Sequence, residues 1–511
     1  MIAPRDRAVS LLRDVITLPT CARLCAAGVA LLVAATSAWS QVTAPPDAPP
    51  AGGDRTAAAA APDDRAEAHA EFKRLLDAGD FSAAAEHASR VVELTERDAP
   101  GQPEELQVAL MNLALAQHRA GEYVSAETSY QRVIGLVEAS GRLTSPRLAR
   151  AHAGLATTYY AARRYDLAAA EFERAIGLSR RSEGLFNEAQ LPLLEKQADS
   201  LVELGRFEEA LRARRYALNV VGRKHGERSL PFARELHSLG RWYTRVGSYE
   251  ASRATLRKSV ELFAALSGPA STDLVEPLAA LAENARRWLQ DPQFREAAAL
   301  DPERSVPFHD IPMPTPPTLS ASTIASEGQK ALEAAASIVA ANPDAPPALV
   351  AGVRAQLGDW YVVRDQPERA LPHYRQAWLV AATAADGAAL RQSLFGAPVL
   401  LSYVAPESWN RHAQRPPEAV EVRLVDIELI VTARGGVREP RAVGGTGEQR
   451  LVSQALRSLQ TARYRPRLEE GEPVETAGVR FTQPFYVLRE TEPAGQTGPP
   501  PPTAPPPQGG G

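Results

Sequence analysis

The side chains that carry most enzyme chemistry are scattered along this chain of 511 residues. None of the nine histidines stands in a His-x-x-x-His spacing, and the two cysteines, Cys21 and Cys25, both lie close to the N-terminus. Zinc sites need clustered ligands of these types, and no Gly-x-Ser-x-Gly nucleophile elbow occurs. We therefore expect no catalytic site, no metal and no other cofactor, and we predict that the protein is not an enzyme.

Two polar clusters have simple interpretations. The stretch Gly444-Gly445-Thr446-Gly447 precedes a predicted helix, and helix N-termini can hold anions through free amides. It lacks the lysine and the spacing of a phosphate loop. We interpret it as a turn into a helix that Thr446 caps, with Gln449 completing a capping box. The acidic pairs Glu208-Glu209 and Glu469-Glu470 are interpreted as solvated surface.

A repeat of 42 residues organises the first half of the chain. Its members share a turn residue, then an aromatic residue, then a small residue. The turn residues are Gly79, Gly121, Arg163, Gly205 and Gly247, the aromatic residues are Phe81, Tyr123, Tyr165, Phe207 and Tyr249, and the small residues are Ala84, Ala126, Ala168, Ala210 and Ser252. Apolar residues at helical spacing surround them, which predicts helix, tight turn, helix. Glycine tolerates the left-handed turn, so Arg163 predicts a strained one.

This pattern resembles the tetratricopeptide repeat family. The resemblance rests on Leu155-Ala156, Tyr159, Tyr165, Ala168, Phe172 and Ala175, and again on Leu239-Gly240, Tyr243, Gly247 and Tyr249. It covers about residues 66–290 and implies an α-solenoid of helical hairpins. Solenoids of this type usually bind other proteins.

In that family the first helices of the hairpins line a concave groove. The resemblance implies that the groove residues follow the Ala or Gly marker of each first helix or precede it by one turn. These residues are Met111, Leu115, His118, Thr157, Tyr160, Glu195, Asp199, His237 and Arg241. Such a mixture suits an extended peptide of mixed charge. The alternative is that some of these side chains only solvate the concave surface.

Composition divides the remainder of the helical region. Residues 270–300 are interpreted as a worn capping pair, and a second block repeats the marker spacing at Leu357-Gly358, Tyr361, Ala370, Tyr374 and Ala377. The predicted boundaries are 41–65 for a disordered Ala/Pro-rich linker, 66–300 for the repeat array, 301–320 for a Pro-rich linker, 321–390 for the second block, 391–417 for a connector and 491–511 for a disordered Pro/Gly-rich tail.

The last hundred residues change from helical to alternating periodicity, which predicts strand, strand, helix, strand. They resemble the C-terminal domain of TonB-type energy transducers over about residues 418–490. The resemblance rests on Val425 to Val437 with its Gly-Gly turn, Tyr464-x-Pro466, Gly471-x-Pro473-Val474 and Val479-x-Phe481. It implies a small α+β domain in the periplasm that grips an extended segment by strand addition.

The resemblance places the strand-addition edge at Val479, Phe481, Phe485 and Val487. The alternative is a structural cap without a free edge.

The N-terminus has the pattern of an export signal. Arg5, Arg7 and Arg13 precede an apolar stretch, and Ala38-Trp39-Ser40 gives a cleavage pattern before Gln41. We expect residues 1–40 to be a signal peptide, which would remove both cysteines. The alternative is an uncleaved membrane anchor.

Together these patterns predict a mainly α protein, a tetratricopeptide-type α-solenoid followed by a small α+β domain. We expect an exported periplasmic scaffold that binds protein or peptide partners, including outer-membrane receptor segments. The alternative is a TonB-type energy transducer, anchored in the inner membrane by an uncleaved N-terminal segment and acting in outer-membrane transport. The formal net charge of −4 argues against nucleic acid, and membrane contact requires the N-terminal segment to be retained.

Overall fold

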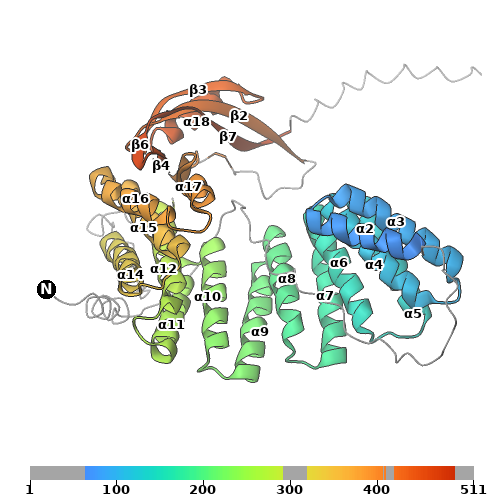
Figure 1. Cartoon of the computed structure of the whole chain (residues 1–511). Coiled ribbons are helices and arrows are strands. Elements are labelled where there is room, and N and C mark those ends of the chain that lie inside the picture. Colours follow the sequence, from blue (N-terminus) through green and yellow to red (C-terminus); the bar gives the residue numbers. More distant parts are fainter. Residues whose placement is uncertain (1–63, 292–318, 407, 410–418, 490–511) are drawn as a thin grey trace, which may run out of the picture. The chain divides into compact units, whose positions relative to one another are not determined.

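The computed structural model describes residues 64–291, 319–406, 408–409 and 419–489 (Figure 1). It divides into two compact units, with the boundary between Gly268 and Pro269. The predicted signal peptide, most of the Ala/Pro-rich and Pro-rich linkers and the predicted C-terminal tail lie outside the described residues. We describe each unit by itself.

The first unit consists of helices that pair into consecutive hairpins. The pairs are α2 with α3, α4 with α5, α6 with α7, α8 with α9 and α10 with α11. Their bounds are α2 Asp64–Ala78, α3 Phe81–Asp98, α4 Pro103–Arg119, α5 Tyr123–Ala139, α6 Pro146–Ala161, α7 Tyr165–Glu183, α8 Leu191–Glu203, α9 Phe207–His225, α10 Leu230–Arg245 and α11 Tyr249–Ser267. The predicted solenoid of helical hairpins is therefore present.

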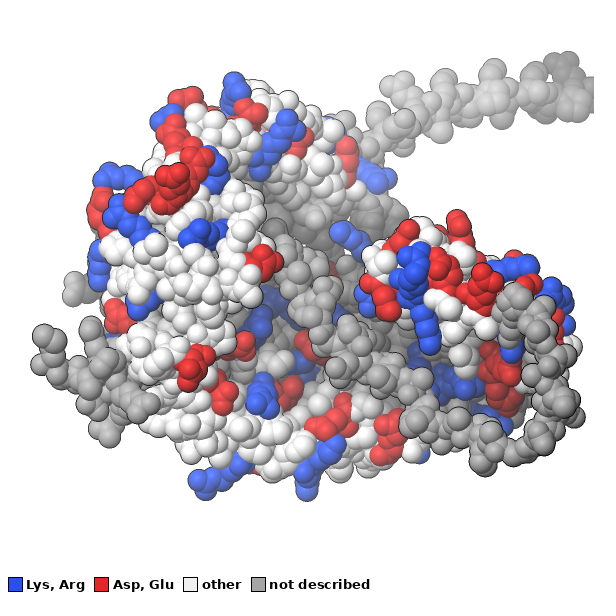
Figure 2. All heavy atoms as spheres, viewed as in Figure 1, with Lys and Arg blue, Asp and Glu red and all other residues white. Residues whose placement is uncertain are grey.

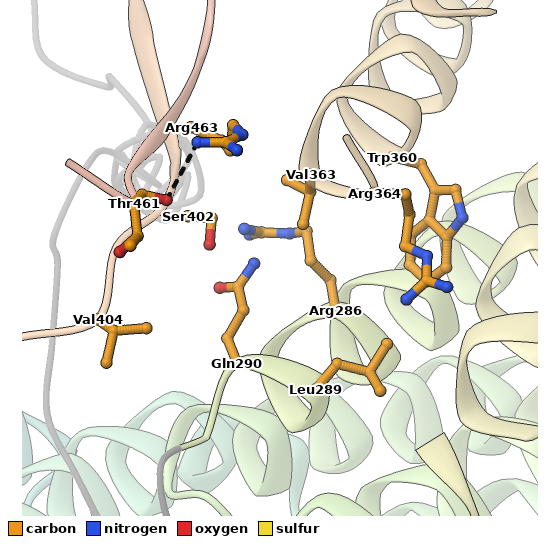
Figure 3. A pocket seen from close by; sticks show the side chains of 10 residues that line it. All are labelled: Arg286, Leu289, Gln290, Trp360, Val363, Arg364, Ser402, Val404, Thr461 and Arg463. Carbon is orange, nitrogen blue, oxygen red and sulfur yellow. Dashed lines mark hydrogen bonds between the residues drawn. The ribbon is translucent and has the colours of Figure 1, made fainter. Parts of the chain in front are cut away.

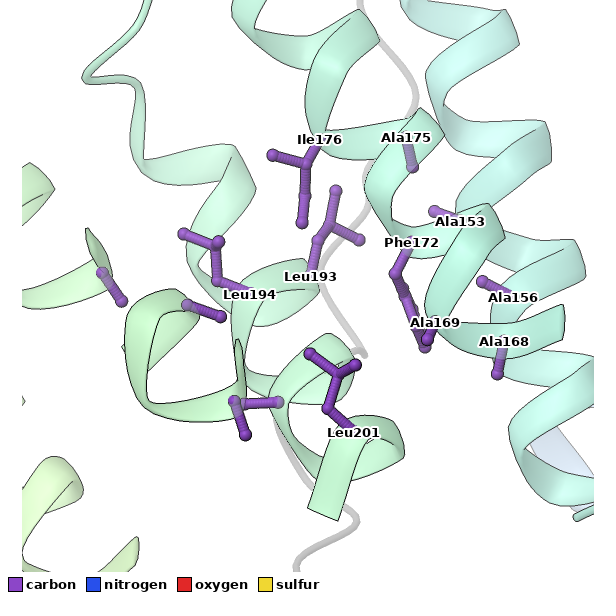
Figure 4. Packing of buried hydrophobic residues seen from close by; sticks show 14 of the residues in the cluster. Ala153, Ala156, Ala168, Ala169, Phe172, Ala175, Ile176, Leu193, Leu194 and Leu201 are labelled. Atoms are coloured by element: carbon purple, nitrogen blue, oxygen red, sulfur yellow. The ribbon is translucent and has the colours of Figure 1, made fainter. Parts of the chain in front are cut away.

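Small residues let the two helices of a hairpin cross closely. Ala156 of α6 and Ala168 of α7 are both fully buried, and Figure 4 shows them beside Phe172 in the core shared with α8. In α10 a Cβ atom added to Gly240 would lie 2.5 Å from the Leu256 side chain. A larger residue at this marker position would force the helices apart, because packed interiors hold no spare volume.

The predicted turn strain is also observed. Gly121 and Gly205 have φ angles of 82° and 72°, and Arg163, at the same place in its hairpin, has φ of 59°. A residue with a Cβ atom is disfavoured in this left-handed region. Asp365, in the equivalent turn of the second unit, has φ of 58°.

The second unit begins with helices that continue the hairpin pattern. Their bounds are α12 Val275–Gln290, α14 Ala321–Ala341, α15 Pro347–Val363, α16 Pro367–Ala381 and α17 Gly387–Phe395. Helix α12 packs against α14, and α15 packs against α16.

This pairing differs from the expected arrangement of a capping pair followed by a separate block. Helix α14 is the hairpin partner of α12, although the two are far apart along the chain. A Cβ atom on Gly328 of α14 would lie 2.9 Å from the Ala285 Cβ atom of α12, so this hairpin also has a close crossing. The intervening residues 292–318 break the repeat register, and periodicity alone could not reveal the pairing.

The strands described in the second unit form three small sheets. Their bounds are β1 Val399–Ser402, β2 Val420–Val431, β3 Val437–Gly445, β4 Arg463–Arg465, β5 Arg467–Glu469, β6 Glu472–Val474 and β7 Thr476–Leu488, with helix α18 at Gln449–Leu459 between β3 and β4. The largest sheet has the antiparallel order β3-β2-β7, while β1 pairs with β4 and β5 pairs with β6.

Helix α18 covers one face of the large sheet. Ile427 and Leu429 of β2 share a buried core with Ala455 and Leu459 of α18. The expected succession of strand, strand, helix and strand is present, with β1 and the short strands β4, β5 and β6 in addition. The TonB-like identity of this region remains a prediction.

The predicted cap of α18 is wrong. The residue at the N-cap is Glu448, which makes no side-chain cap hydrogen bond. The Thr446 hydroxyl instead accepts a hydrogen bond of 3.1 Å from the Leu424 N–H. The hydroxyl that resembled a helix cap therefore serves the neighbouring strand.

A buried ion pair joins β4 to the helices of the second unit. Arg465 donates from Nε to Oδ1 of Asp359 at 2.8 Å and from Nη2 to Oδ2 at 2.6 Å. Tyr374 of α16 donates to the same carboxylate at 2.9 Å, and Arg465 also donates to the Leu394 carbonyl at 2.8 Å. The β region and helices α15 to α17 are thus held together by a fully hydrogen-bonded charge pair.

The left-handed turn at Arg163 predicts that Arg163→Gly stabilises the protein. Glycine removes the Cβ penalty, so we expect the free energy of unfolding to rise by about 1 kcal/mol. Chemical denaturation measures this. Arg163→Ala keeps the penalty and serves as the control; an equal gain in both variants would contradict the backbone explanation.

The buried pair predicts that Asp359→Asn destabilises the second unit by about 3 kcal/mol, because it leaves the Arg465 charge buried without a counter-ion. Differential scanning calorimetry of the full chain measures the loss. Glu472→Gln is the matched control, since Glu472 forms a bidentate pair with Arg375 that is exposed and should contribute nothing measurable. Equal effects of the two variants would show that burial of the Asp359 pair carries no energetic weight.

Candidate partner-binding surface

The first helices of the hairpins, α4, α6, α8 and α10, present corresponding positions on one side. We call this set of side chains the first-helix surface. It comprises Val108, Leu115, His118, Thr157, Tyr160, Glu195, Lys196, Asp199, Glu203, Arg234, Arg241 and Arg245. Helix α4 contacts α6, and α6 contacts α8, so the surface continues from one hairpin to the next.

The part on α4 is apolar with one neutral imidazole. Val108 and Leu115 are 45% and 37% exposed. His118 lies with Nδ1 3.2 Å from the Thr158 hydroxyl, and burial followed by the charge of Arg119 lowers its pKa. The predicted groove residue Met111 adds less exposed area to this surface, because it is half-buried and packs against two hydrophobic core clusters.

The middle of the surface is an aromatic and charged cluster on α6 and α8. The Tyr160 ring centroid lies 5.3 Å from the Lys196 ammonium and 5.5 Å from the Tyr165 ring. Burial, followed by the charges of Asp199 and Glu203, raises the pKa of Tyr160 to about 12. The phenol is therefore neutral at physiological pH and offers a ring face beside carboxylates.

Asp199 is more buried than a freely solvated groove residue would be. It is 6% exposed and forms ion pairs with Arg245 of α10 and, at 3.8 Å, with Lys196. The sequence analysis missed these two cations. Both lie on the exposed face of their helices, one turn or nearly one turn from a predicted residue, so extending the register by three or four positions would have found them.

The part on α10 is basic. Arg234 and Arg241 are exposed there, while burial followed by the charge of Arg241 lowers the pKa of His237 to about 4. His237 is therefore neutral at pH 7 and adds no charge. Glu195 of α8 is exposed, and Thr157 of α6 turns its hydroxyl to the Ala153 carbonyl at 2.8 Å.

Charges of both signs are mixed over the face of the molecule that Figure 2 shows. Blue and red side chains alternate along the visible helical hairpins, and no extended basic face is seen there. A mixed surface of this kind favours partners that carry both charges. It gives no footprint for a nucleic acid on that face.

A buried charge pair lies behind the first-helix surface. Arg214 of α9 is 2% exposed, donates to the Ser238 hydroxyl at 2.7 Å and lies 3.6 Å from Oε1 of Glu235. Neither the Arg214 Nε atom nor the Glu235 Oε1 atom has a hydrogen-bond partner. Burial raises the pKa of Glu235 to about 7, although the Arg214 charge opposes the shift.

The predicted strand-addition residues point into the domain core. Phe485 is fully buried, and Val479, Phe481 and Val487 pack against the core that α18 covers. Strand β7 itself lies at the edge of the sheet β3-β2-β7. A partner segment could therefore bind this edge through the backbone of β7 and not through these four side chains.

Part of that backbone edge is already engaged. The Tyr486 N–H donates to the Trp409 carbonyl at 2.8 Å, and Pro484 has no N–H to donate. Backbone groups alternate between the two sides of a strand, so Arg480 and Thr482 share the outward side with Tyr486. Within the described residues no strand pairs with that side.

The second unit contains a cavity of about 290 Å³ between α12, α15, β1 and β4. Figure 3 shows the Arg286 guanidinium and the Gln290 amide pointing toward Ser402, with Arg463 bonded to Thr461. Two of the lining arginines are committed to protein partners. Arg286 pairs with Glu283 and donates to the Leu401 carbonyl, and Arg463 pairs with Asp365. We interpret the cavity as an imperfectly packed contact between these helices and strands.

The described residues offer neither a metal cluster nor a membrane span. Within them no group of three or more histidine, cysteine, aspartate or glutamate residues could hold a metal ion. In the same part of the chain, every helix is too short or too polar to cross a bilayer.

Comparisons with known proteins agree with the repeat geometry. A family model for the tetratricopeptide repeat matches residues 105–181, which begin in α4 and end in α7. Residues 105–181 therefore match the tetratricopeptide repeat, a fold that generally serves as a protein-binding scaffold. No curated protein matches the chain.

Three of the solved structures that match parts of the chain have the following similarity to it. The crystal structure of a putative kinesin light chain from Podosopora anserina with nearly identical TPR-like repeats is 16% identical, covers 39% of this chain and 95% of that chain, and has a TM-score of 0.36. A Rap protein complexed with Competence and Sporulation Factor is 12% identical, with coverages of 63% and 76% and a TM-score of 0.31. The TPR2AB domain of yeast Sti1 in complex with pHSP90 is 14% identical, with coverages of 65% and 96% and a TM-score of 0.21.

The raised pKa of Glu235 predicts a pH-dependent stability. The folded state holds the Glu235 proton from its ordinary pKa near 4.5 up to about 7, so stability from this group is complete below pH 4.5 and is lost as the pH rises through 7. Glu235→Gln cannot ionise, and at pH 8 it should be more stable than the wild type by about 2 kcal/mol.

Urea denaturation at pH 8 and pH 5 measures this difference, which should be much smaller at pH 5. Glu208→Gln, at an exposed position on α9, is the control and should change neither value. A Glu235→Gln effect of the same size at both pH values would contradict the assigned titration.

Proposed function

We propose that the protein is an exported periplasmic scaffold whose repeat array binds an extended peptide segment of a partner on the first-helix surface. The observation that carries this proposal is the alignment of at least partly exposed apolar, aromatic and charged side chains on α4, α6, α8 and α10, with the largely buried Asp199 among them. They occupy one register, while the marker residues next to them are buried.

The chemistry of the surface fits a linear partner. Its character changes from apolar at Leu115 through aromatic and acidic at Tyr160 and Glu203 to basic at Arg241. Neighbouring packed helices are about 8–10 Å apart, which about three residues of extended chain span. A peptide crossing the helices would meet a different chemistry every few residues, and this arrangement provides specificity.

The C-terminal β region supplies a second proposed contact. A TonB-like domain would take an extended segment of an envelope partner, such as an outer-membrane receptor, along the outer side of β7. The free backbone groups of Arg480 and Thr482 support this proposal. Pro484 and the bond from Tyr486 to Trp409 restrict the segment to the first half of the strand.

The proposed location and the competing anchored energy transducer differ at the N-terminus. Export with cleavage gives a mature chain that starts at Gln41, whereas an anchored transducer keeps residues 1–40. Intact-mass measurement of the protein from cell envelopes separates them. A chain beginning at Met1 in the membrane fraction would overturn the periplasmic scaffold.

The first-helix surface predicts site-specific cross-linking to a shared partner. A photo-reactive amino acid at Leu115 or at Thr157 should capture the same partner in cells, because both positions lie on this surface. Gel mobility and mass spectrometry identify the products. Val124 of α5, which is 78% exposed, is the control position and should not capture that partner.

Cross-linking of the same partner from Val124 as strongly as from Leu115 would show that binding does not use the first-helix surface. Different partners at Leu115 and Thr157 would likewise argue against one extended segment crossing α4 and α6.

A further inference from the structure

The second unit already holds an extended segment of this chain against a first helix. Strand β4 ends at Arg465, and Pro466 follows it. The Arg465 guanidinium makes two hydrogen bonds to the Asp359 carboxylate of α15, and its carbon lies 5.6 Å from the Phe395 ring centroid. The arginine is thus bound by a buried carboxylate with an aromatic ring beside it.

Asp359 occupies a defined place in its hairpin. It follows Gly358, where an added Cβ atom would lie 2.4 Å from Tyr374 of the second helix. In α10 an added Cβ atom on Gly240 would lie 2.5 Å from Leu256, and the separation along the chain is the same in both hairpins. The two markers therefore sit at equivalent crossings, and the residue after each marker faces the same side.

Asp199 is the equivalent residue in α8 of the first unit, because it follows the marker Ala198. Both aspartates are buried, at 6% exposure for Asp199 and 8% for Asp359. They differ in their partners. The Arg465 side chain is 11% exposed, whereas Arg245, which pairs with Asp199, is 48% exposed.

An exchange of the partner of Asp199 is energetically accessible. A half-exposed guanidinium gains little from its ion pair, since water and salt screen it. Lys196, the other cation, lies 3.8 Å away and is also largely exposed. The Tyr160 ring and the Glu203 carboxylate, one helical turn from Asp199, border the same place and offer a ring face and a second negative charge.

We propose that Asp199, flanked by Tyr160 and Glu203, binds an arginine side chain from an extended segment of a partner protein, which displaces Arg245. This inference rests on the proposed peptide-binding function and names its ligand chemistry. The guanidinium forms two parallel hydrogen bonds to the carboxylate and lies over the ring. Lysine cannot form the paired bonds.

The probe for the experiment is a fluorescein-labelled peptide with the sequence of residues 461–468 in which glutamine replaces Arg463 and Arg467. Arg465, the arginine that Asp359 binds in the second unit, is then its single arginine. Fluorescence anisotropy measures its affinity for the full chain. Asp199→Asn should weaken binding at least 10-fold. Arg245→Gln should tighten binding several-fold, because the peptide no longer competes with a resident arginine; this gain cannot come from unfolding.

The matched controls test the arginine itself. Asp166→Asn, at an exposed carboxylate in the first turn of α7, should leave binding unchanged. A peptide with glutamine in place of Arg465 should bind weakly to the wild type and should lose nothing further with Asp199→Asn. This double-mutant cycle assigns the loss to one pair of groups.

Equal binding of the peptide to the wild type, Asp199→Asn and Arg245→Gln would overturn the inference, and so would an absence of binding to all three. If the common cross-linked partner at Leu115 and Thr157 persists in that case, the peptide-binding function stands without an arginine at Asp199. Loss of that common partner would overturn the peptide-binding function instead.

Discussion

Close contact between the two helices of each hairpin is the constraint on which the rest of the structure depends. Alanine or glycine at the marker of α4, α6, α8 and α10 allows it, as at Ala156, Ala198 and Gly240. Once the marker faces the second helix, the helical period determines the direction of every other position. The next residue along the chain points out of the hairpin toward the first-helix surface. The same geometry that packs the core therefore places Asp199 and Tyr160 where a partner can reach them.

In the second unit, the corresponding surface of α15 is covered by another segment of the chain. Its outward positions on α15 meet the β region, since Asp359 binds Arg465 and a Cβ atom on Gly435 would lie 2.9 Å from Val362. A buried ion pair contributes little net stability over a well-packed apolar pair, because desolvation of both charges offsets their attraction. The ion pair between Asp359 and Arg465 contributes mainly by fixing the geometry of this contact. The paired hydrogen bonds admit one position of β4 against α15, and this fixes the register of the β1–β4 sheet that covers the helices.

The sequence alone was sufficient to predict the structural features that repeat along the chain. A marker, a turn residue and an aromatic residue at constant spacing predicted the hairpins and the strained turn at Arg163. It was insufficient where contacts join distant segments. The pairing of α12 with α14 crosses residues 292–318, and the bond from Thr446 to Leu424 joins a loop to a strand. Such contacts leave no periodic signal, since each depends on one pair of residues.

Buried charge in the array was missed for a related reason. Arg214 stands where the corresponding residues are Tyr130, Phe172 and Leu256, so a pattern of apolar positions passes over it. Its neighbour Glu235 is poorly solvated and keeps its proton to higher pH. Charges placed just behind a binding surface strengthen its electrostatic field, because the low dielectric screens them weakly.

Selectivity on the first-helix surface follows from the same partial burial. A carboxylate as enclosed as Asp199 must keep a cationic partner, since leaving it unpaired costs more than the pair returns. Arg245 meets this need in the free protein, reaching in from the solvent side. A partner segment without a cation at this point would have to leave Arg245 in place and fit around it, whereas a segment with a guanidinium can take its position and add contacts to Tyr160. In the proposed complex the enclosed aspartate would therefore exclude segments without a cation at this point, as well as bind segments that carry a guanidinium.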